Sequence, residues 1–186
     1  MTGKMLAFIG TREPTVVSEE IRTLYDQAAA AAVWSGYTVV TGAAVGFDQI
    51  AAASALQAGG LVLLVLPWHS YEQRWWSYKI KAYPGKVHTL VYNPSTHQSW
   101  TDSVYRYHSA PAKLTRGAFA LQARNFGIIA SASSVIAVPN PTKTWGGGTG
   151  QGIKIARDQG KRVFDLTHPE DFNVLERRIS VYKDSF

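Results

Sequence analysis

The chain has 186 residues, a formal net charge of +6 and an apolar content of 46%, and it contains no cysteine. This length and composition exclude bulk disorder, and the lack of cysteine excludes disulfides, thiolate metal sites and cysteine nucleophiles. No apolar run, Leu61 to Leu66 included, is long enough to cross a bilayer, and the N-terminus has no secretion-signal pattern. We therefore expect a cytoplasmic protein that does not associate with membranes.

Short apolar runs alternate with segments that carry helix start and stop signals. Ser18 suits an N-cap, for example, and Gly36 suits the position after the last turn of the same helix. The expected strands are Met5–Ile9, Tyr37–Thr41, Leu61–Leu66, Val87–Tyr92, Val135–Val138 and Arg162–Asp165. The expected helices are Ser18–Ser35, Asp48–Ala58, Tyr71–Lys81, Thr115–Ala132, Ile153–Gln159 and a terminal helix from Pro169. Asn93 to Pro111 is expected to be a loop.

The alternation of apolar strands with helices predicts an α/β fold, a Rossmann-like, doubly wound and mostly parallel sheet. We expect a single domain over residues 1–186, in which residues 67–121 form an aromatic and basic insertion. Between Pro67 and Gln122 there are seven Lys and Arg but only two Asp and Glu, and four of the six tryptophans. The candidate nucleic-acid contacts in this insertion are Trp75, Trp76, Lys79 and Lys81. Alternatively, the tryptophans are core residues or contacts of a homodimer.

Ligands of open parallel sheets bind beyond the carboxyl ends of the strands, and two glycine-rich segments are expected there. One is Gly42–Gly46, and the other is Gly146–Gly152. Both precede a helix, so both could hold a phosphate with backbone N–H groups, or they could simply make tight turns. Neither segment is a Walker A motif or a Gly-x-Gly-x-x-Gly fingerprint.

Several side chains are expected at the same edge of the sheet. Arg12 could clamp a phosphate or lie solvated, and Asp48 could bind a ribose hydroxyl or cap its helix. Arg124 and Asn125 lie on a helix of mostly small apolar residues, which favours a ligand contact. The candidate phosphate- and ligand-binding residues are Gly10, Thr11, Arg12, Gly42, Ala43, Gly46, Asp48, Arg124, Asn125, Gly146, Gly147, Gly148 and Thr149.

The sequence offers little support for a metal or a catalytic triad. The five histidines have no metal-ligand spacing, and the chain contains no Gly-x-Ser-x-Gly motif. We expect no metal, no catalytic residue and no resident cofactor, although a bound nucleotide is compatible with the glycine segments.

These motifs together resemble the DNA-processing protein A (Smf) family. The residues that carry the resemblance are Gly10-Thr11-Arg12, Thr41-Gly42-Ala43-Ala44-Val45-Gly46-Phe47-Asp48, Ala55-Leu56 with Gly59-Gly60 and Val62–Leu66, Ala123-Arg124-Asn125-Phe126-Gly127-Ile128-Ile129-Ala130, Gly147-Gly148-Thr149 and Gly160-Lys161-Arg162-Val163-Phe164. The resemblance covers about residues 5–66 and 122–166, and residues 67–121 match poorly. It implies a Rossmann-like fold, a basic pocket for single-stranded DNA, and a link to recombinase loading or DNA uptake.

Two departures from the family argue against recombinase loading. Phe126 replaces the family's second arginine, and the chain is too short for the family's flanking helical and winged-helix domains. The expected partner is therefore single-stranded DNA or a nucleotide.

Three other functions stay open, one of them enzymatic. The wider superfamily includes Lonely Guy-type nucleotide phosphoribohydrolases, but their catalytic glutamate corresponds to Gly152 here, and the proline of their motif corresponds to Thr144. An enzyme acting on the N-glycosidic bond of a nucleotide could use only Asp48 or Asp165 as a nearby acid. A nucleotide-sensing module and a structural protein with a vestigial pocket are the non-enzymatic alternatives.

Overall fold

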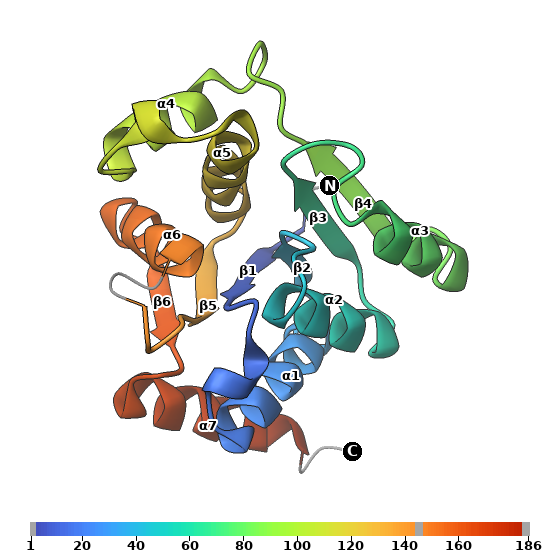
Figure 1. The fold of residues 1–186 in the computed structure, drawn as a ribbon. Coiled ribbons are helices and arrows are strands. Elements are labelled where there is room, and N and C mark those ends of the chain that lie inside the picture. Colours follow the sequence, from blue (N-terminus) through green and yellow to red (C-terminus); the bar gives the residue numbers. More distant parts are fainter. Residues whose placement is uncertain (1–2, 144–146, 184–186) are drawn as a thin grey trace.

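The computed structural model describes residues 3–143 and 147–183, and their arrangement is an open sheet covered by helices on both faces (Figure 1). The strands are β1 (Met5–Gly10), β2 (Thr38–Thr41), β3 (Val62–Leu66), β4 (Val87–Val91), β5 (Ser134–Val138) and β6 (Arg162–Asp165). The α-helices are α1 (Glu19–Trp34), α2 (Phe47–Gln57), α3 (Gln73–Ala82), α4 (Gln98–Tyr107), α5 (Arg116–Ala130), α6 (Gly147–Asp158) and α7 (Pro169–Lys183). Two short 3-10 helices are η1 (Pro14–Val16) and η2 (Pro111–Lys113).

The described strands form one six-stranded sheet of order β4-β3-β2-β1-β5-β6, and every neighbouring pair is parallel. The expected Rossmann-like fold is therefore confirmed. The strand order reverses between β1 and β5, because the chain first builds outward from β1 to β4 and then returns to pair β5 with β1. Such a switch point opens a crevice beyond the carboxyl ends of the two strands.

Alternating residues of each strand face two separate cores. Phe8 packs with α1, α2 and α7, whereas its neighbours Ala7 and Ile9 pack with α4, α5 and α6. The same alternation continues in β3, where Leu64 belongs to the first core and Leu63 to the second. Both faces of the sheet are thus buried, which explains why its strands read as continuous apolar runs.

The segment from Asn93 to Pro111, expected to be loop, contains α4, so this prediction was wrong. Trp100, Ser103 and Val104 are buried on one side of α4, and they follow the i, i+3, i+4 spacing of an amphipathic helix. Because one of these three buried positions is a serine, the sequence does not show the apolar periodicity of a helix.

The glycine-rich segment was expected to remain a loop until Ile153, but α6 already begins at Gly147. Tertiary contacts override the low helix propensity of glycine here. A Cβ at Gly152 would lie 2.7 Å from Ile9 Cδ1, and one at Gly148 would lie 3.3 Å from Asn125 Nδ2. The glycines therefore let the start of α6 approach β1 and α5 closely.

Candidate functional site

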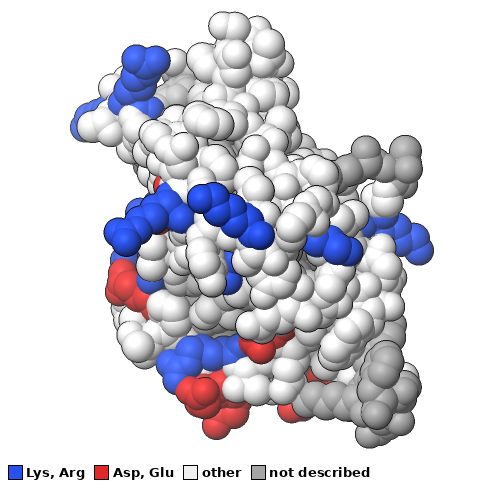
Figure 2. All heavy atoms as spheres, turned by 90° about the vertical axis from the view of Figure 1, so that its right-hand side faces the viewer, with Lys and Arg blue, Asp and Glu red and all other residues white. Residues whose placement is uncertain are grey.

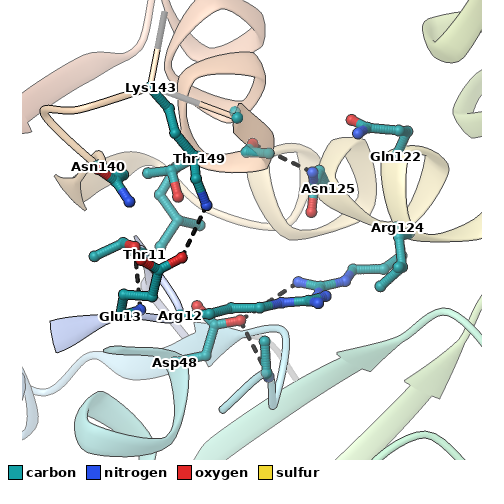
Figure 3. Close-up of a pocket in the computed structure, with 17 residues that line it drawn as sticks. Thr11, Arg12, Glu13, Asp48, Gln122, Arg124, Asn125, Asn140, Lys143 and Thr149 are labelled. Atoms are coloured by element: carbon teal, nitrogen blue, oxygen red, sulfur yellow. Dashed lines mark hydrogen bonds and ion pairs between the residues drawn. The ribbon is translucent and has the colours of Figure 1, made fainter. Parts of the chain in front are cut away.

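A cavity of about 420 Å³ lies at the switch point, where β1 and β5 end. Gly10, Thr11 and Arg12 border it from the end of β1, and Asn140 borders it from the segment after β5. Leu121, Gln122, Arg124 and Asn125 of α5 form a second wall, and the first turn of α6 closes the cavity. Figure 3 shows Arg12, Asp48 and Arg124 along one side and Asn140, Thr149 and Asn125 along the other.

Arg124 and Asp48 form a buried ion pair beside the cavity. Arg124 Nη1 lies 3.5 Å from Asp48 Oδ2, and the two residues are 5% and 4% exposed. The Ala44 N–H donates a further hydrogen bond of 3.3 Å to Asp48 Oδ2. Burial raises the pKa of the Asp48 carboxyl, which outweighs the opposing effects of the Arg124 charge and of the N–H groups of Ala44 and Gly10.

Two further cations reach the cavity from its exposed side. Arg12 Nη2 donates a hydrogen bond of 3.1 Å to Tyr71 Oη, and Lys143 Nζ lies 2.9 Å from Glu13 Oε1. The Lys143–Glu13 pair is half exposed, with side chains 54% and 52% accessible, so it contributes little stability and can exchange for a stronger anion. Both cations are therefore available to a ligand.

Two asparagine side chains, Asn125 of α5 and Asn140 after β5, also border the cavity. Asn125 Nδ2 donates to the Gly148 carbonyl at 3.3 Å and to Gln151 Oε1 at 3.0 Å, which ties α5 to α6. Asn140 is only 3% exposed, and its Oδ1 accepts hydrogen bonds from the N–H and hydroxyl of Thr142. Its Nδ2 atom has no hydrogen-bond partner within residues 3–143 and 147–183.

An unpaired buried amide donor is costly, because it has lost its hydrogen bonds to water. Here it lies beside a helix N-terminus, whose free N–H groups and positive dipole end favour an anion. Arg12 and Lys143 supply formal positive charge at the same place. The combination is suited to a phosphate or carboxylate group.

Most of the candidate residues meet at this cavity. The ones that line it are Gly10, Thr11, Arg12, Asp48, Arg124, Asn125, Gly147, Gly148 and Thr149. Gly146 and Thr144 lie outside the described residues. Gly152 also lines the cavity, so the position that corresponds to the phosphoribohydrolase glutamate carries no carboxylate here.

Gly42, Ala43 and Gly46 do not line the cavity, but Gly42 and Gly46 pack closely against residues that do. A Cβ at Gly42 would overlap the Arg124 guanidinium, so glycine makes the space that Arg124 occupies. Gly46 has a φ of 97° and approaches the Thr11 carbonyl so closely that a Cβ there would lie 2.6 Å from this oxygen. Ala43 is buried with a φ of 61°. Because the Ala44 N–H is bound to Asp48, this segment holds charged side chains in place rather than offering that N–H to a phosphate.

The residues chosen from the insertion lie on α3, and among the described residues α3 contributes nothing to the lining of the cavity. Trp76 is 7% exposed, and its indole N–H donates to the Tyr71 carbonyl at 3.0 Å, so it anchors α3 and has no free face for a base. Trp75 is half buried, with Lys79 Nζ 5.7 Å from its ring centroid. Figure 2, which looks onto the side of α3 and β4, shows Lys and Arg in a band across this face.

Several polar residues in or beside the site were not among the candidates chosen from the sequence. They include Tyr71, Gln122, Asn140 and Lys143. Asn140 and Lys143 lie on the segment that follows β5, so their place after a strand end was a usable signal, and Gln122 precedes Asn125 by three residues on α5. Tyr71 gave none. It receives the Arg12 hydrogen bond, and the Arg124 guanidinium carbon lies 5.8 Å from its ring centroid.

Neither a metal centre nor a membrane span emerges from the described part of the chain. Over residues 3–143 and 147–183, no three His, Asp or Glu side chains gather closely enough to hold a metal ion. No helix in these ranges combines the length and apolar character that crossing a membrane requires.

The all-parallel sheet, with a cavity at its switch point, defines a Rossmann-like α/β protein. The family model for DNA recombination-mediator protein A matches residues 1–176, and the chain belongs to this family. The match confirms the resemblance to DNA-processing protein A. It also extends over residues 67–121, where the motifs alone match poorly.

Solved structures give the same fold. DNA processing protein A from Streptococcus pneumoniae is 20% identical with a TM-score of 0.58, and the match covers 87% of this chain and 50% of that one. The chain therefore spans half the length of this relative. The Helicobacter pylori protein, described by its single-stranded DNA binding mode, is 17% identical with a TM-score of 0.62, over 98% of this chain and 81% of that one.

The molybdenum cofactor carrier protein from Chlamydomonas reinhardtii has a TM-score of 0.54 at 15% identity, and the match covers 97% of both chains. No curated protein sequence matches the chain. At these identities the structural matches establish the fold alone, and the ligand must be argued from the site.

Proposed function

We propose that this protein binds single-stranded DNA and holds one backbone phosphate in the cavity at the switch point. The observation that carries the proposal is the buried amide of Asn140, whose donor atom has no partner among the described residues and lies beside the first turn of α6. A phosphate oxygen would satisfy this donor, and Arg12 and Lys143 would neutralise the phosphate charge.

Membership of the DNA recombination-mediator protein A family supports a nucleic-acid ligand. The Helicobacter pylori relative, whose single-stranded DNA binding mode is described, agrees with this choice. The net charge of +6 favours any polyanion, and the backbone phosphates of a strand would add to the single phosphate held in the cavity.

A free nucleotide is the second candidate, and the size of the cavity favours it. At about 420 Å³ the cavity falls within the range of roughly 300–1,000 Å³ that small-molecule sites occupy. The phosphate would use the same donors in both cases, so the two candidates differ only in what continues beyond it.

The test is a titration of the protein into a fluorescent oligothymidine of about 16 nucleotides at low salt, followed by anisotropy. Arg12→Ala removes one charge-assisted hydrogen bond, worth about 1.5–3 kcal/mol, so affinity should fall about tenfold or more. Lys4→Ala is the matched control, because Lys4 is exposed, carries the same charge and lies at the other end of β1. It should bind like the wild type.

Three results would contradict or redirect the proposal. Wild-type protein that fails to bind the oligonucleotide at low salt excludes the strand, and equal affinity of Arg12→Ala and wild type excludes the cavity. If thymidine monophosphate competes as well as the oligonucleotide does on a molar basis, the ligand is the free nucleotide.

A further inference from the structure

A second hollow continues from the phosphate cavity along the outer side of α6. Its volume is about 980 Å³, and it shares Asn140, Lys143 and Gly148 with the cavity. The side facing α4 is formed by residues 107–109, and the side facing β6 is formed by Asp165, Thr167 and His168. A ligand that extends out of the cavity can therefore pass directly into this groove.

The floor of the groove presents two cations of α6. Lys154 and Arg157 are exposed, line the groove and follow Gly147 by seven and ten residues. Lys154 and Arg157 are three residues apart and so are neighbours on the helix surface, about 10 and 15 Å from Gly147 along the helix axis. Lys154 Nζ also lies 5.8 Å from the ring centroid of Tyr107, which links this cation to the wall of the groove.

The two carboxylates that line the groove, Asp158 and Asp165, already have partners within the protein. Asp158 lies 3.8 Å from Arg106, and Asp165 is buried, where it accepts hydrogen bonds from the N–H and hydroxyl of Thr167 and lies 3.5 Å from His168. Lys154 and Arg157, in contrast, face the open groove without an ion pair among the described residues. The groove therefore carries positive charge that is free to meet an incoming polyanion.

We propose that this groove is a second subsite, in which Lys154 and Arg157 bind the backbone phosphates that follow the one held in the cavity. The inference rests on the proposed function, and it makes the ligand an oligonucleotide that runs along α6, from its first turn toward Arg157. Gln122, Asn140 and Lys143 lie where the two hollows join, so the strand would cross from one to the other at these residues.

The test compares ligands of two lengths with the double variant Lys154→Ala/Arg157→Ala. With an oligothymidine of about six nucleotides, removing two phosphate contacts should reduce the slope of log affinity against log salt by about 1.4, since each contact with a single strand contributes about 0.7. Thymidine monophosphate, used as a competitor, should bind the double variant and the wild type equally, because it reaches only the cavity.

The matched control is Lys4→Ala/Arg177→Ala, which removes two exposed positive charges outside the groove and should leave the slope unchanged. If the groove variant keeps the wild-type slope with the hexamer, or loses no more than this control, the second subsite does not exist. Loss of binding in Arg12→Ala together with an unchanged groove variant would support the cavity and reject the groove. If the wild type binds no oligonucleotide at all, the proposed function fails first.

Discussion

The buried ion pair of Asp48 and Arg124 affects both the stability of the fold and the shape of the cavity. Arg124 fills the space that Gly42 leaves open, and its Nη1 atom contacts Asp48 at the wall of the cavity. Taking two charged groups out of water is expensive, and their attraction only partly offsets that cost. We infer that the pair serves mainly to position the arginine, because an apolar core would be at least as stable.

The raised pKa of Asp48 predicts how stability depends on pH. The folded protein holds the proton on this carboxyl more tightly than the unfolded chain, whose ordinary value is 3.8. The wild type should therefore lose stability relative to Asp48→Asn as the pH rises from about 4 to 7, because the unfolded state releases the proton first. Urea unfolding of both proteins across this range measures the difference.

Asp26→Asn, at an exposed carboxylate of α1, is the control for that series and should track the wild type closely. The prediction is wrong if the difference between wild type and Asp48→Asn stays constant or grows in favour of the wild type with rising pH. Either result would mean that the Arg124 charge dominates over burial.

The sequence could predict individual residues of the site but not the contacts between them. Arg124 and Asp48 were both chosen, each for its own local reason, but their contact joins positions 76 residues apart and has no local signature. Tyr71 is the clearer case. It comes from the insertion and contacts both arginines of the cavity, yet an aromatic residue in an aromatic segment does not stand out.

Among the elements, the packing of α4 on α5 depends on the large side chain of Trp100 and on Gly127, which has no side chain. Trp100 is buried against Gly127, and a Cβ at Gly127 would overlap the indole ring. Since α5 carries Arg124 and Asn125, this contact also fixes one wall of the cavity. A glycine within a helix costs about 1 kcal/mol relative to alanine, so its presence there needs a packing reason, and Trp100 supplies it.

The contact predicts that Gly127→Ala has opposite effects on stability in the presence and in the absence of Trp100. Gly127→Ala should destabilise the wild type, because the rigid indole must move, whereas in Trp100→Ala it should stabilise by up to about 1 kcal/mol through helix propensity. Trp100→Ala alone should cost about 3–5 kcal/mol. Chemical denaturation of the four proteins gives the coupling energy, and additive effects would show that the two residues do not touch.

Element prediction succeeded where periodicity was strong and failed where packing overrode it. The buried strands β3 and β5 and the helix α1 were expected almost at their observed bounds, since apolar runs and caps are local signals. The start of α6 was missed because four glycines in its first six residues oppose a helix in isolation. Gly152 and Gly148 allow close packing against Ile9 and Asn125, and these contacts form only in the folded chain.

On the scale of the whole molecule, the sheet separates two basic regions. The cavity and groove lie at the switch point beside α5 and α6, whereas α3 packs at the β4 edge with the opposite core. The band of Lys and Arg in Figure 2 lies on that edge. A short strand seated in the cavity would not need α3, but a long strand that leaves the cavity could contact both regions.

Ligand length should therefore reveal whether α3 takes part in binding. With an oligothymidine of about six nucleotides, Lys79→Ala/Lys81→Ala should give the wild-type salt dependence, because among the described residues α3 does not line the cavity. With about 30 nucleotides the same variant should show a slope of log affinity against log salt that is shallower by about 1.4, which corresponds to two lost phosphate contacts. The control Lys4→Ala/Arg177→Ala should behave like the wild type at both lengths. An unchanged slope with the long strand would mean that Lys79 and Lys81 are solvated charges around Trp75. A reduced slope with the short strand would instead place α3 in contact with the first nucleotides, and the path along α6 would then have to be abandoned.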